Sequence, residues 1–262
     1  MLKVNVLVDL FFKEVSFPER IPKVAECGYS AIETWQGKDA VLLKEIGKAC
    51  SENNVDFASI VLNGVGDNAV APSWKGNLEA FLERIDKYSD NALAAGCRSG
   101  IVTAGNLNEK QSTDEHCKYL TESLKKAGEL AAKKGFNLNL EPLNTLVDHK
   151  GYFLDSRETA LEIVKEINMP NVKMLYDIYH MEIMTGNHTE FITANIKYIG
   201  HFHCAGVPGR HEPFNGETNY PFIMKKIEEA AYEGYFGLEY MPLLSSTESL
   251  MKTLKYFKSG KQ

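Results

Sequence analysis

The sequence predicts an α/β protein built as a single closed (β/α)8 barrel, the TIM-barrel architecture. Short apolar segments alternate strictly with longer amphipathic segments along the 262 residues, and eight segments of each kind can be counted. Alternating βα units form a parallel sheet covered by helices, and about 250 residues is the usual size of an eight-unit barrel. No segment rich in Pro, Gly or Ser divides the chain, so residues 1–262 are expected to form one domain. An open, doubly wound sheet is the alternative architecture.

The predicted strands are short runs of apolar residues bounded by turn or helix signals. They cover residues 4–8, 31–33, 55–61, 99–102, 136–141, 172–177, 198–203 and 236–239. The fifth run is followed by Pro142, which cannot donate a backbone hydrogen bond and therefore stops a strand.

The predicted helices are the longer segments in which apolar residues recur with helical spacing. They cover residues 18–27, 40–53, 77–95, 114–134, 156–167, 188–195, 220–232 and 247–257. Gly28, Gly96 and Gly135 each follow one of these segments, and glycine is the usual residue at the left-handed position that ends a helix.

Composition and charge exclude several classes of function. The net charge of −6 argues against a nucleic-acid partner, because binding to the phosphate backbone normally needs a basic surface. No run of apolar residues is long enough to span a membrane, and residues 1–8 read as a strand rather than as a secretion signal. The five cysteines include no Cys-x-x-Cys pair, which indicates neither a disulfide framework nor a zinc ribbon. We therefore expect a cytoplasmic protein.

Four consecutive predicted strands in the second half of the chain end in a residue that can bind a metal ion. These residues are Glu141, Asp177, His203 and Glu239. Active sites of such barrels lie at the carboxyl ends of the strands, and a carboxylate there is costly to bury unless it is paired or ligated. Three carboxylates and one imidazole suit Mn²⁺, Co²⁺ or Mg²⁺, and Zn²⁺ also binds such sets. The alternative is that these groups form salt bridges that close the barrel mouth.

Several longer stretches carry a resemblance to a known family. They cover residues 10–20, 140–144 with 151–154, 176–181, and 206–213 continued by 216–221. These stretches resemble the xylose isomerase-like barrels and, within them, the hydroxypyruvate isomerases. The Gly-Arg-His-Glu-Pro segment at 209–213 is the most specific of them.

The resemblance implies a metal-dependent isomerase. Glu141 and Glu239 would be metal ligands that also act as the catalytic acid/base pair, while Asp177 and His203 would complete the coordination. A carboxylate would remove a proton from a carbon next to a carbonyl and return it to the neighbouring carbon, through an enediolate whose charge the metal stabilises.

Five further residues are expected to bind substrate. The resemblance implies that His180 and Arg210 contact substrate oxygens, and that Glu212 orients Arg210 or ligates a second metal. Glu33 ends a strand and is expected to bond His180 or a substrate hydroxyl, the alternative being an ordinary strand-end charge. Trp35 is expected to form an apolar wall against the substrate, the alternative being a packed loop aromatic.

The resemblance to the hydroxypyruvate isomerases fails at three places. His203 stands where those enzymes generally have Gln, which is more similar to the ketose 3-epimerases. The loop at 33–38 and the segment at 148–150 also differ from their usual sequences. These departures indicate isomerase chemistry on a substrate other than hydroxypyruvate.

The predicted substrate is therefore a small aldose- or ketose-type hydroxy-carbonyl compound or a sugar acid. A ketose 3-epimerase or a keto-polyol dehydratase could use the same site. An endonuclease IV-like nuclease would need more ligands on the early strands, and a non-catalytic sugar-binding barrel is a further alternative. Analogy with related barrels implies a homo-oligomer.

Overall fold

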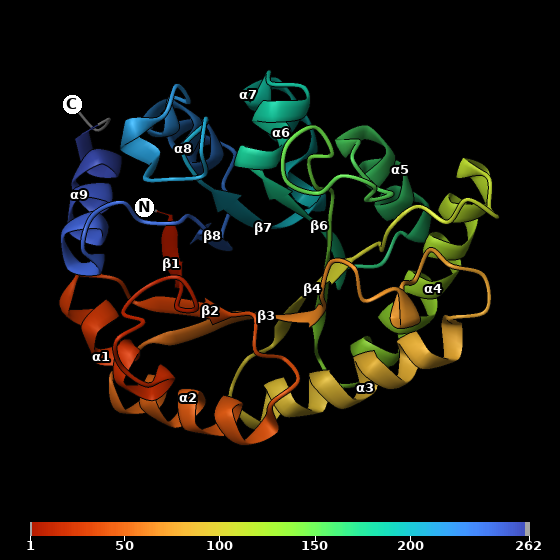
Figure 1. Ribbon diagram of the computed structural model, residues 1–262, viewed down its shortest axis with the longest axis horizontal. Helices are drawn as coiled ribbons and strands as arrows, with labels where there is room; N and C mark the ends of the chain where they lie inside the picture. The colour runs from red at the N-terminus through yellow and green to blue at the C-terminus, as the bar shows by residue number, and fades with distance from the viewer. Residues whose placement is uncertain (1, 260–262) are drawn as a thin grey trace.

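The computed structural model describes residues 2–259, which form a closed barrel of parallel strands surrounded by helices (Figure 1). The strands follow one another around the barrel in chain order, and the first strand pairs with the last. The predicted fold class is confirmed, and the open sheet is excluded because the barrel has no free edge.

The strand boundaries lie close to the predicted ones, with the largest difference at β3, which runs two residues further. The strands are β1 (Lys3–Leu7), β2 (Ala31–Thr34), β3 (Asp56–Asn63), β4 (Ser99–Thr103), β5 (Asn137–Glu141), β6 (Val172–Asp177), β7 (Ile199–Cys204) and β8 (Tyr235–Leu238).

The helices include one that the sequence did not predict, α6. They are α1 (Phe17–Glu26), α2 (Ala40–Glu52), α3 (Leu78–Ala94), α4 (Thr113–Lys133), α5 (Arg157–Ile167), α6 (Ile178–Met184), α7 (His188–Asn195), α8 (Tyr220–Glu229) and α9 (Ser246–Ser259). The first four residues of α6 are all buried, so it lacks the alternating apolar and polar faces that predict an outer helix. Asp177 begins it, because its side chain accepts a hydrogen bond from the backbone nitrogen of Tyr179 at 2.8 Å.

None of the helices within residues 2–259 is both long enough and apolar enough to cross a membrane.

The strand register places two of the predicted site residues side by side. Asp177 of β6 is paired with His203 of β7, and His203 is paired with Gly237 of β8. On the other side of β6, Glu141 at the end of β5 is paired with Thr103 at the end of β4. The carboxyl ends of these neighbouring strands therefore form one rim.

Two helical glycines let helices pack closely, but against different kinds of neighbour. A Cβ on Gly47 of α2 would lie 2.3 Å from the backbone oxygen of Ala95, which follows α3. A Cβ on Gly128 of α4 would lie 2.6 Å from Cγ2 of Val172 and 3.0 Å from Sδ of Met169, which are side-chain atoms. Side-chain atoms can shift more cheaply than a backbone carbonyl at a helix end.

We expect Gly47→Ala to lower the free energy of unfolding by roughly 1–3 kcal/mol, because overpacking outweighs a gain of about 1 kcal/mol in helix propensity. Gly128→Ala serves as the matched comparison and should cost less. Urea unfolding followed by circular dichroism measures both. A Gly47→Ala variant as stable as the wild type would contradict the close backbone approach.

Candidate active site

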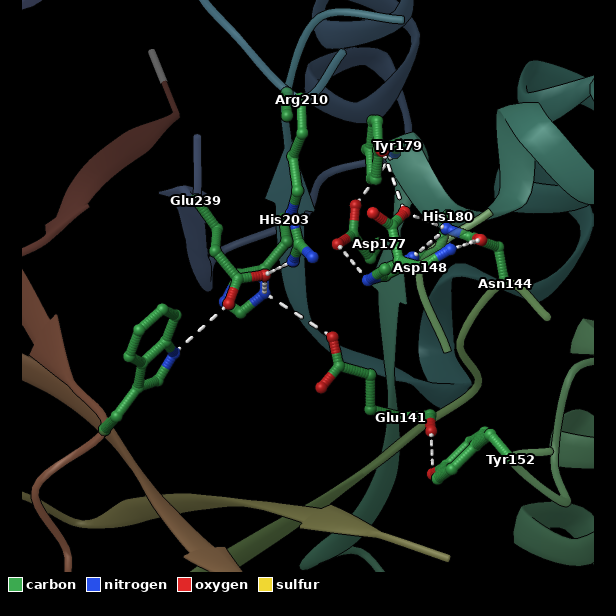
Figure 2. Close-up of polar contacts among 12 residues, drawn as sticks. Glu141, Asn144, Asp148, Tyr152, Asp177, Tyr179, His180, His203, Arg210 and Glu239 are labelled. Carbon is green, nitrogen blue, oxygen red and sulfur yellow. Dashed lines mark hydrogen bonds and ion pairs between the residues drawn. The ribbon is translucent and has the colours of Figure 1, made fainter. Parts of the chain in front are cut away.

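The four predicted metal ligands come together at the carboxyl ends of β5 to β8 (Figure 2). Ligand atoms of Glu141, Asp177, Glu239 and His180 all lie within 4.8 Å of one another. The Nδ1 atom of His203 lies 3.1 Å from Oε2 of Glu239 and 3.6 Å from Oε1 of Glu141. We call Glu141, Asp177, His203 and Glu239 the acidic cluster.

Burial makes the acidic cluster electrostatically costly. Glu141, Asp177 and Glu239 are only 6%, 1% and 7% exposed. Burial raises the pKa of Glu141, and it raises the pKa of Asp177 to about 7. Burial acts on Glu239 in the same sense, but Arg210 and His203 outweigh it and lower the pKa of that carboxyl. The protein's own cations thus compensate only part of the cluster's negative charge.

The residues present fit a divalent metal ion. Oε1 of Glu141 and Nδ1 of His203 are buried polar atoms without a hydrogen-bond partner. Buried polar atoms are nearly always satisfied, so such a group of unpaired ligand atoms beside carboxylates indicates a binding site. Oxygen and imidazole ligands are those that suit Mn²⁺, Co²⁺, Mg²⁺ or Zn²⁺.

Glu33 lies beneath His203 and does not line the cavity, whereas a bond to His180 or to a substrate hydroxyl was expected. His201 Nε2 donates a hydrogen bond to Oε2 of Glu33 at 2.8 Å, and Nε2 of His203 lies 3.0 Å from Oε1. Burial opposes the charge on Glu33, but the two histidines lower its pKa to about 2. Gly237 leaves the space for this pair, since a Cβ there would lie 2.6 Å from Oε1 of Glu33.

Arg210 reaches the cluster from a tightly folded loop after β7. Its Nη2 atom donates to Oε2 of Glu239 at 2.8 Å, and its guanidinium lies 5.1 Å from the ring centre of Tyr179. The backbone of Arg210 has a φ of 57°, and its nitrogen donates to the oxygen of Gly206 at 2.9 Å. A left-handed backbone at an arginine is uncommon, and such conformations persist where the surrounding contacts enforce them. The carboxylates outweigh burial and raise the pKa of Arg210.

Trp35 lines the cavity, as predicted for a wall residue. Its Nε1 atom donates to Oε1 of Glu239 at 3.2 Å, and its side chain is 44% exposed. Asp9, which the sequence analysis did not identify, accepts hydrogen bonds from the backbone nitrogen of Trp35 at 3.0 Å and from the hydroxyl of Thr34 at 2.7 Å. Asp9 thus holds the loop that carries the tryptophan.

The side chain of Glu212 does not line the cavity, and its carboxylate instead accepts hydrogen bonds from the segment that follows β8. Its Oε1 atom accepts hydrogen bonds from the backbone nitrogens of Leu243 and Leu244 and from the hydroxyl of Ser249, at 2.9, 3.1 and 3.0 Å. This arrangement joins the loops after β7 and β8. The expected contact with Arg210 is not found among residues 2–259, where Arg210 pairs with Glu239, and Glu212 does not line the cavity.

His180 lies in the first turn of α6 and is wholly buried beside the cluster. Its Nε2 atom is 3.4 Å from Oδ2 of Asp177, and its Nδ1 atom is 2.6 Å from Nδ2 of Asn144. Burial, reinforced by the charge of Arg210, lowers the pKa of His180 well below its usual value. The sequence did not identify Asn144 as a site residue, although it is the last residue of the stretch 140–144 that carries the family resemblance.

A cavity of about 460 Å³ opens above the cluster, within the range of small-molecule sites. Glu141, His180, His203, Arg210 and Glu239 form its polar end. The remaining wall combines apolar and aromatic residues with a few polar and basic ones: Trp35, Lys38, Val61, Leu62, Asn63, Gly64, Val65, Arg84, Tyr88, Ile101, Thr103, Leu143 and His149. Such an arrangement can hold a small polar molecule by one end and bring two carboxylates to its carbon chain.

Comparisons with known proteins agree with this architecture. A model of the family described as "Xylose isomerase-like TIM barrel" matches residues 21–259. The chain is similar to 2-oxo-tetronate isomerase of Pectobacterium atrosepticum, with 30% identity over 92% of this chain and 93% of the relative. It is also similar to hydroxypyruvate isomerase of Escherichia coli, with 29% identity over 95% of this chain and 97% of the relative.

Among solved structures, one described as an AP endonuclease of family 2 from Brucella melitensis superposes with a TM-score of 0.87 at 29% identity. The match covers 98% of this chain and 99% of that one. Together with the barrel and the site at its mouth, these similarities show that the chain belongs to the xylose isomerase-like TIM-barrel family.

Proposed function

We propose that this protein is a metal-dependent isomerase that interconverts a small hydroxy-carbonyl compound or sugar acid by proton transfer between adjacent carbons. The observation that carries this proposal is the pair of buried glutamates, Glu141 and Glu239, which meet at the polar end of a substrate-sized cavity. The names of the two relatives, hydroxypyruvate isomerase and 2-oxo-tetronate isomerase, support the same class of reaction.

Glu141, Asp177, His203 and Glu239 would hold the metal ion, for which Mn²⁺, Co²⁺ or Mg²⁺ is proposed. When bound, such an ion supplies Lewis-acid stabilisation of negative charge on substrate oxygens. The unpaired ligand atoms and the incomplete charge compensation of the cluster support this assignment.

The two glutamates are held differently, which suggests how they divide the proton transfer. Glu239 accepts hydrogen bonds from Arg210 and Trp35, whereas Oε1 of Glu141 has no hydrogen-bond partner. We assign Glu141 as the acceptor of the proton from the carbon beside the carbonyl. The C–H electrons form the carbon–carbon double bond of the enediolate, and the carbonyl electron pair moves to oxygen. The protonated Glu141 then returns the proton to the former carbonyl carbon, and the Glu239 carboxylate moves the proton of the substrate hydroxyl to the former carbonyl oxygen as the new carbonyl forms.

The other cavity residues bind and orient the substrate. Arg210 has a planar set of donors that matches a carboxylate or a pair of hydroxyls, and Trp35 covers the carbon chain. His203 and the loop that carries Trp35 differ from those of hydroxypyruvate isomerases, so the proposed substrate is a related compound.

A ketose 3-epimerase is the second candidate, and the specific observation in its favour is a histidine at position 203. An epimerase would use the same glutamates on the two faces of one carbon. A nuclease of the endonuclease IV type is disfavoured, because it would need more metal ligands on the early strands. The potential ligand groups found in residues 2–259 include no residue of β1, β3 or β4.

Metal-loaded protein incubated in D₂O with a panel of ketoses, aldoses and keto acids should form a product that carries deuterium on carbon. Proton NMR of the products measures the position of the label. Deuterium on the former carbonyl carbon, next to the carbon that lost its proton, indicates isomerisation. Deuterium on the carbon that lost its proton, with inverted configuration, indicates epimerisation. Product without deuterium would contradict proton transfer and indicate direct hydride movement, and no product from any compound would contradict the isomerase.

Glu141→Gln and Glu239→Gln should each lower kcat by at least about 10²-fold on the same substrate, since general acid–base catalysis contributes roughly 10²–10⁴. Steady-state kinetics with saturating metal measures the loss. A non-catalytic sugar-binding barrel would instead keep its ligand affinity in both variants and show no turnover in the wild type. Circular dichroism spectra check that each variant is folded.

Metal binding should depend on Glu33, although this residue is not a ligand. Its carboxylate orients His203, and removing a carboxylate behind a metal-bound histidine typically weakens metal affinity by about 10–100-fold. We expect this loss for Mn²⁺ binding to Glu33→Gln in isothermal titration calorimetry.

Glu182→Gln is the matched control for Glu33→Gln. Glu182, which is 23% exposed, contacts Nε2 of the buried His188, and neither residue belongs to the potential ligand groups found in residues 2–259. Its substitution should change metal affinity less than about twofold, within the scatter expected of a distant site. Equal losses in both variants would show that the effect is general destabilisation.

A further inference from the structure

The site contains two buried histidines whose outer nitrogens face partners of opposite hydrogen-bonding character. Nε2 of His203 faces the carboxylate of Glu33 at 3.0 Å, and an ionised carboxylate can only accept. In its neutral form His203 therefore keeps the proton on Nε2 and turns the lone pair of Nδ1 toward Glu141 and Glu239. That is the form of histidine that binds a metal.

The partner of His180 is the amide of Asn144, whose orientation is fixed by its other contacts. Oδ1 of Asn144 accepts hydrogen bonds from the backbone nitrogens of Val147 and Asp148, at 3.1 and 2.9 Å. Nδ2 donates to the carboxylate oxygen Oδ2 of Asp148 at 2.7 Å. Exchanging the two amide atoms would set an NH₂ group against two N–H donors and an oxygen against a carboxylate. The network therefore assigns the NH₂ group to the side facing His180.

The proton of His180 follows from this orientation. The NH₂ group of Asn144 lies 2.6 Å from Nδ1 of His180, so Nδ1 must be the acceptor and the ring proton must be on Nε2. Nε2 is buried, has no hydrogen-bond partner and lies beside Asp177, and His180 lines the substrate cavity (Figure 2). A nitrogen that carries a proton has no lone pair in the ring plane to give to a metal.

We propose that Asn144 is a positioning residue that holds His180 as a neutral N–H donor to a substrate oxygen, and so excludes it from the metal site. This inference rests on the proposed function for its chemical meaning. A neutral imidazole N–H aimed at an oxygen that gains charge in an enolisation stabilises that charge without giving up its proton. Distance alone would group His180 with Glu141, Asp177 and Glu239 as a metal ligand. The orientation of the Asn144 amide therefore decides the role of His180.

The tautomer can be measured directly by ¹⁵N NMR on protein labelled at its seven histidines, since protonated and unprotonated ring nitrogens differ in chemical shift. His180→Gln identifies the His180 signals. We expect the proton on Nε2 in the metal-free protein, and no change at His180 when Mg²⁺ is added. A proton on Nδ1, or a metal-induced shift of Nε2 to that of a ligated nitrogen, would overturn the inference.

Asn144→Asp replaces the NH₂ donor by a carboxylate acceptor and should move the proton of His180 to Nδ1. The ¹⁵N shifts of the two ring nitrogens should then exchange. On the substrate identified in the panel, kcat should fall by about 10²–10³-fold, the usual effect of losing one donor to a developing oxyanion, while KM changes little. An Asn144→Asp variant with wild-type kcat would overturn the inference.

Two further variants separate this effect from damage to the loop. Asn144→Asp alone places a second carboxylate against Asp148. Combining it with Asp148→Asn restores a hydrogen bond between the side chains at 144 and 148, with donor and acceptor exchanged. The double variant should regain stability and keep both the reversed tautomer and the low kcat; recovery of kcat with the tautomer still reversed would refute the proposal. Asn68→Asp adds the same charge in another loop, where its Oδ1 atom accepts from the backbone of Asn106 at 3.2 Å, and should leave kcat unchanged.

The outcomes also separate this inference from the proposed function. If the wild type shows the Nε2 proton and a metal-insensitive His180 but converts no compound in the panel, the isomerase fails and the tautomer assignment stands. If the panel shows deuterium transfer but His180 ligates the metal, the isomerase stands and the role given to Asn144 fails.

Discussion

The burial of three carboxylates at one point of the barrel mouth is the constraint on which the rest of the site depends. Two like charges 4 Å apart repel each other by about 4 kcal/mol at an effective dielectric constant of about 20. Three such pairs would consume most of the 5–15 kcal/mol by which a typical domain is stable. Arg210 and His203 compensate part of this charge, and the remaining ligand atoms point at one centre. A divalent cation would resolve the same conflict and would supply the proposed chemistry.

The barrel provides the rigidity that keeps these charges together. Asp177 and His203 are paired in the strand register, and Gly237 leaves room for His203 and the carboxylate beneath it. Loops complete the site from above, with the backbone of Arg210 held in a left-handed conformation by neighbouring hydrogen bonds. Each group is therefore placed by contacts outside the site itself. Such outer contacts determine which atom of a side chain can bind a metal, donate a hydrogen bond or take a proton.

The fold and the acidic cluster could be predicted because both follow from local sequence patterns. The alternation of strands and helices specifies the parallel barrel, and the residue that ends each strand lies on its rim. Helix α6 was missed because its first four residues are all buried and the short helix lacks an amphipathic pattern. The contacts of Glu33 and Glu212 could not be predicted for a related reason. The sequence places a charge near the rim but does not show whether it faces the cavity or the surrounding protein.

The sequence by itself determined the architecture and the set of carboxylates and histidines that gather at the strand ends, because these depend on periodicity and on residue type at strand ends. Its longer motifs carried the resemblance to the family. Only the tertiary structure decided how those groups are connected. The contacts of Glu33 with His203 and of Trp35 with Glu239 join residues that are far apart in the chain. The orientation of Asn144 depends on three contacts within its own loop. Hydrogen-bond direction is a property of such assembled contacts, and it decides which buried histidine can bind a metal and which can donate a hydrogen bond.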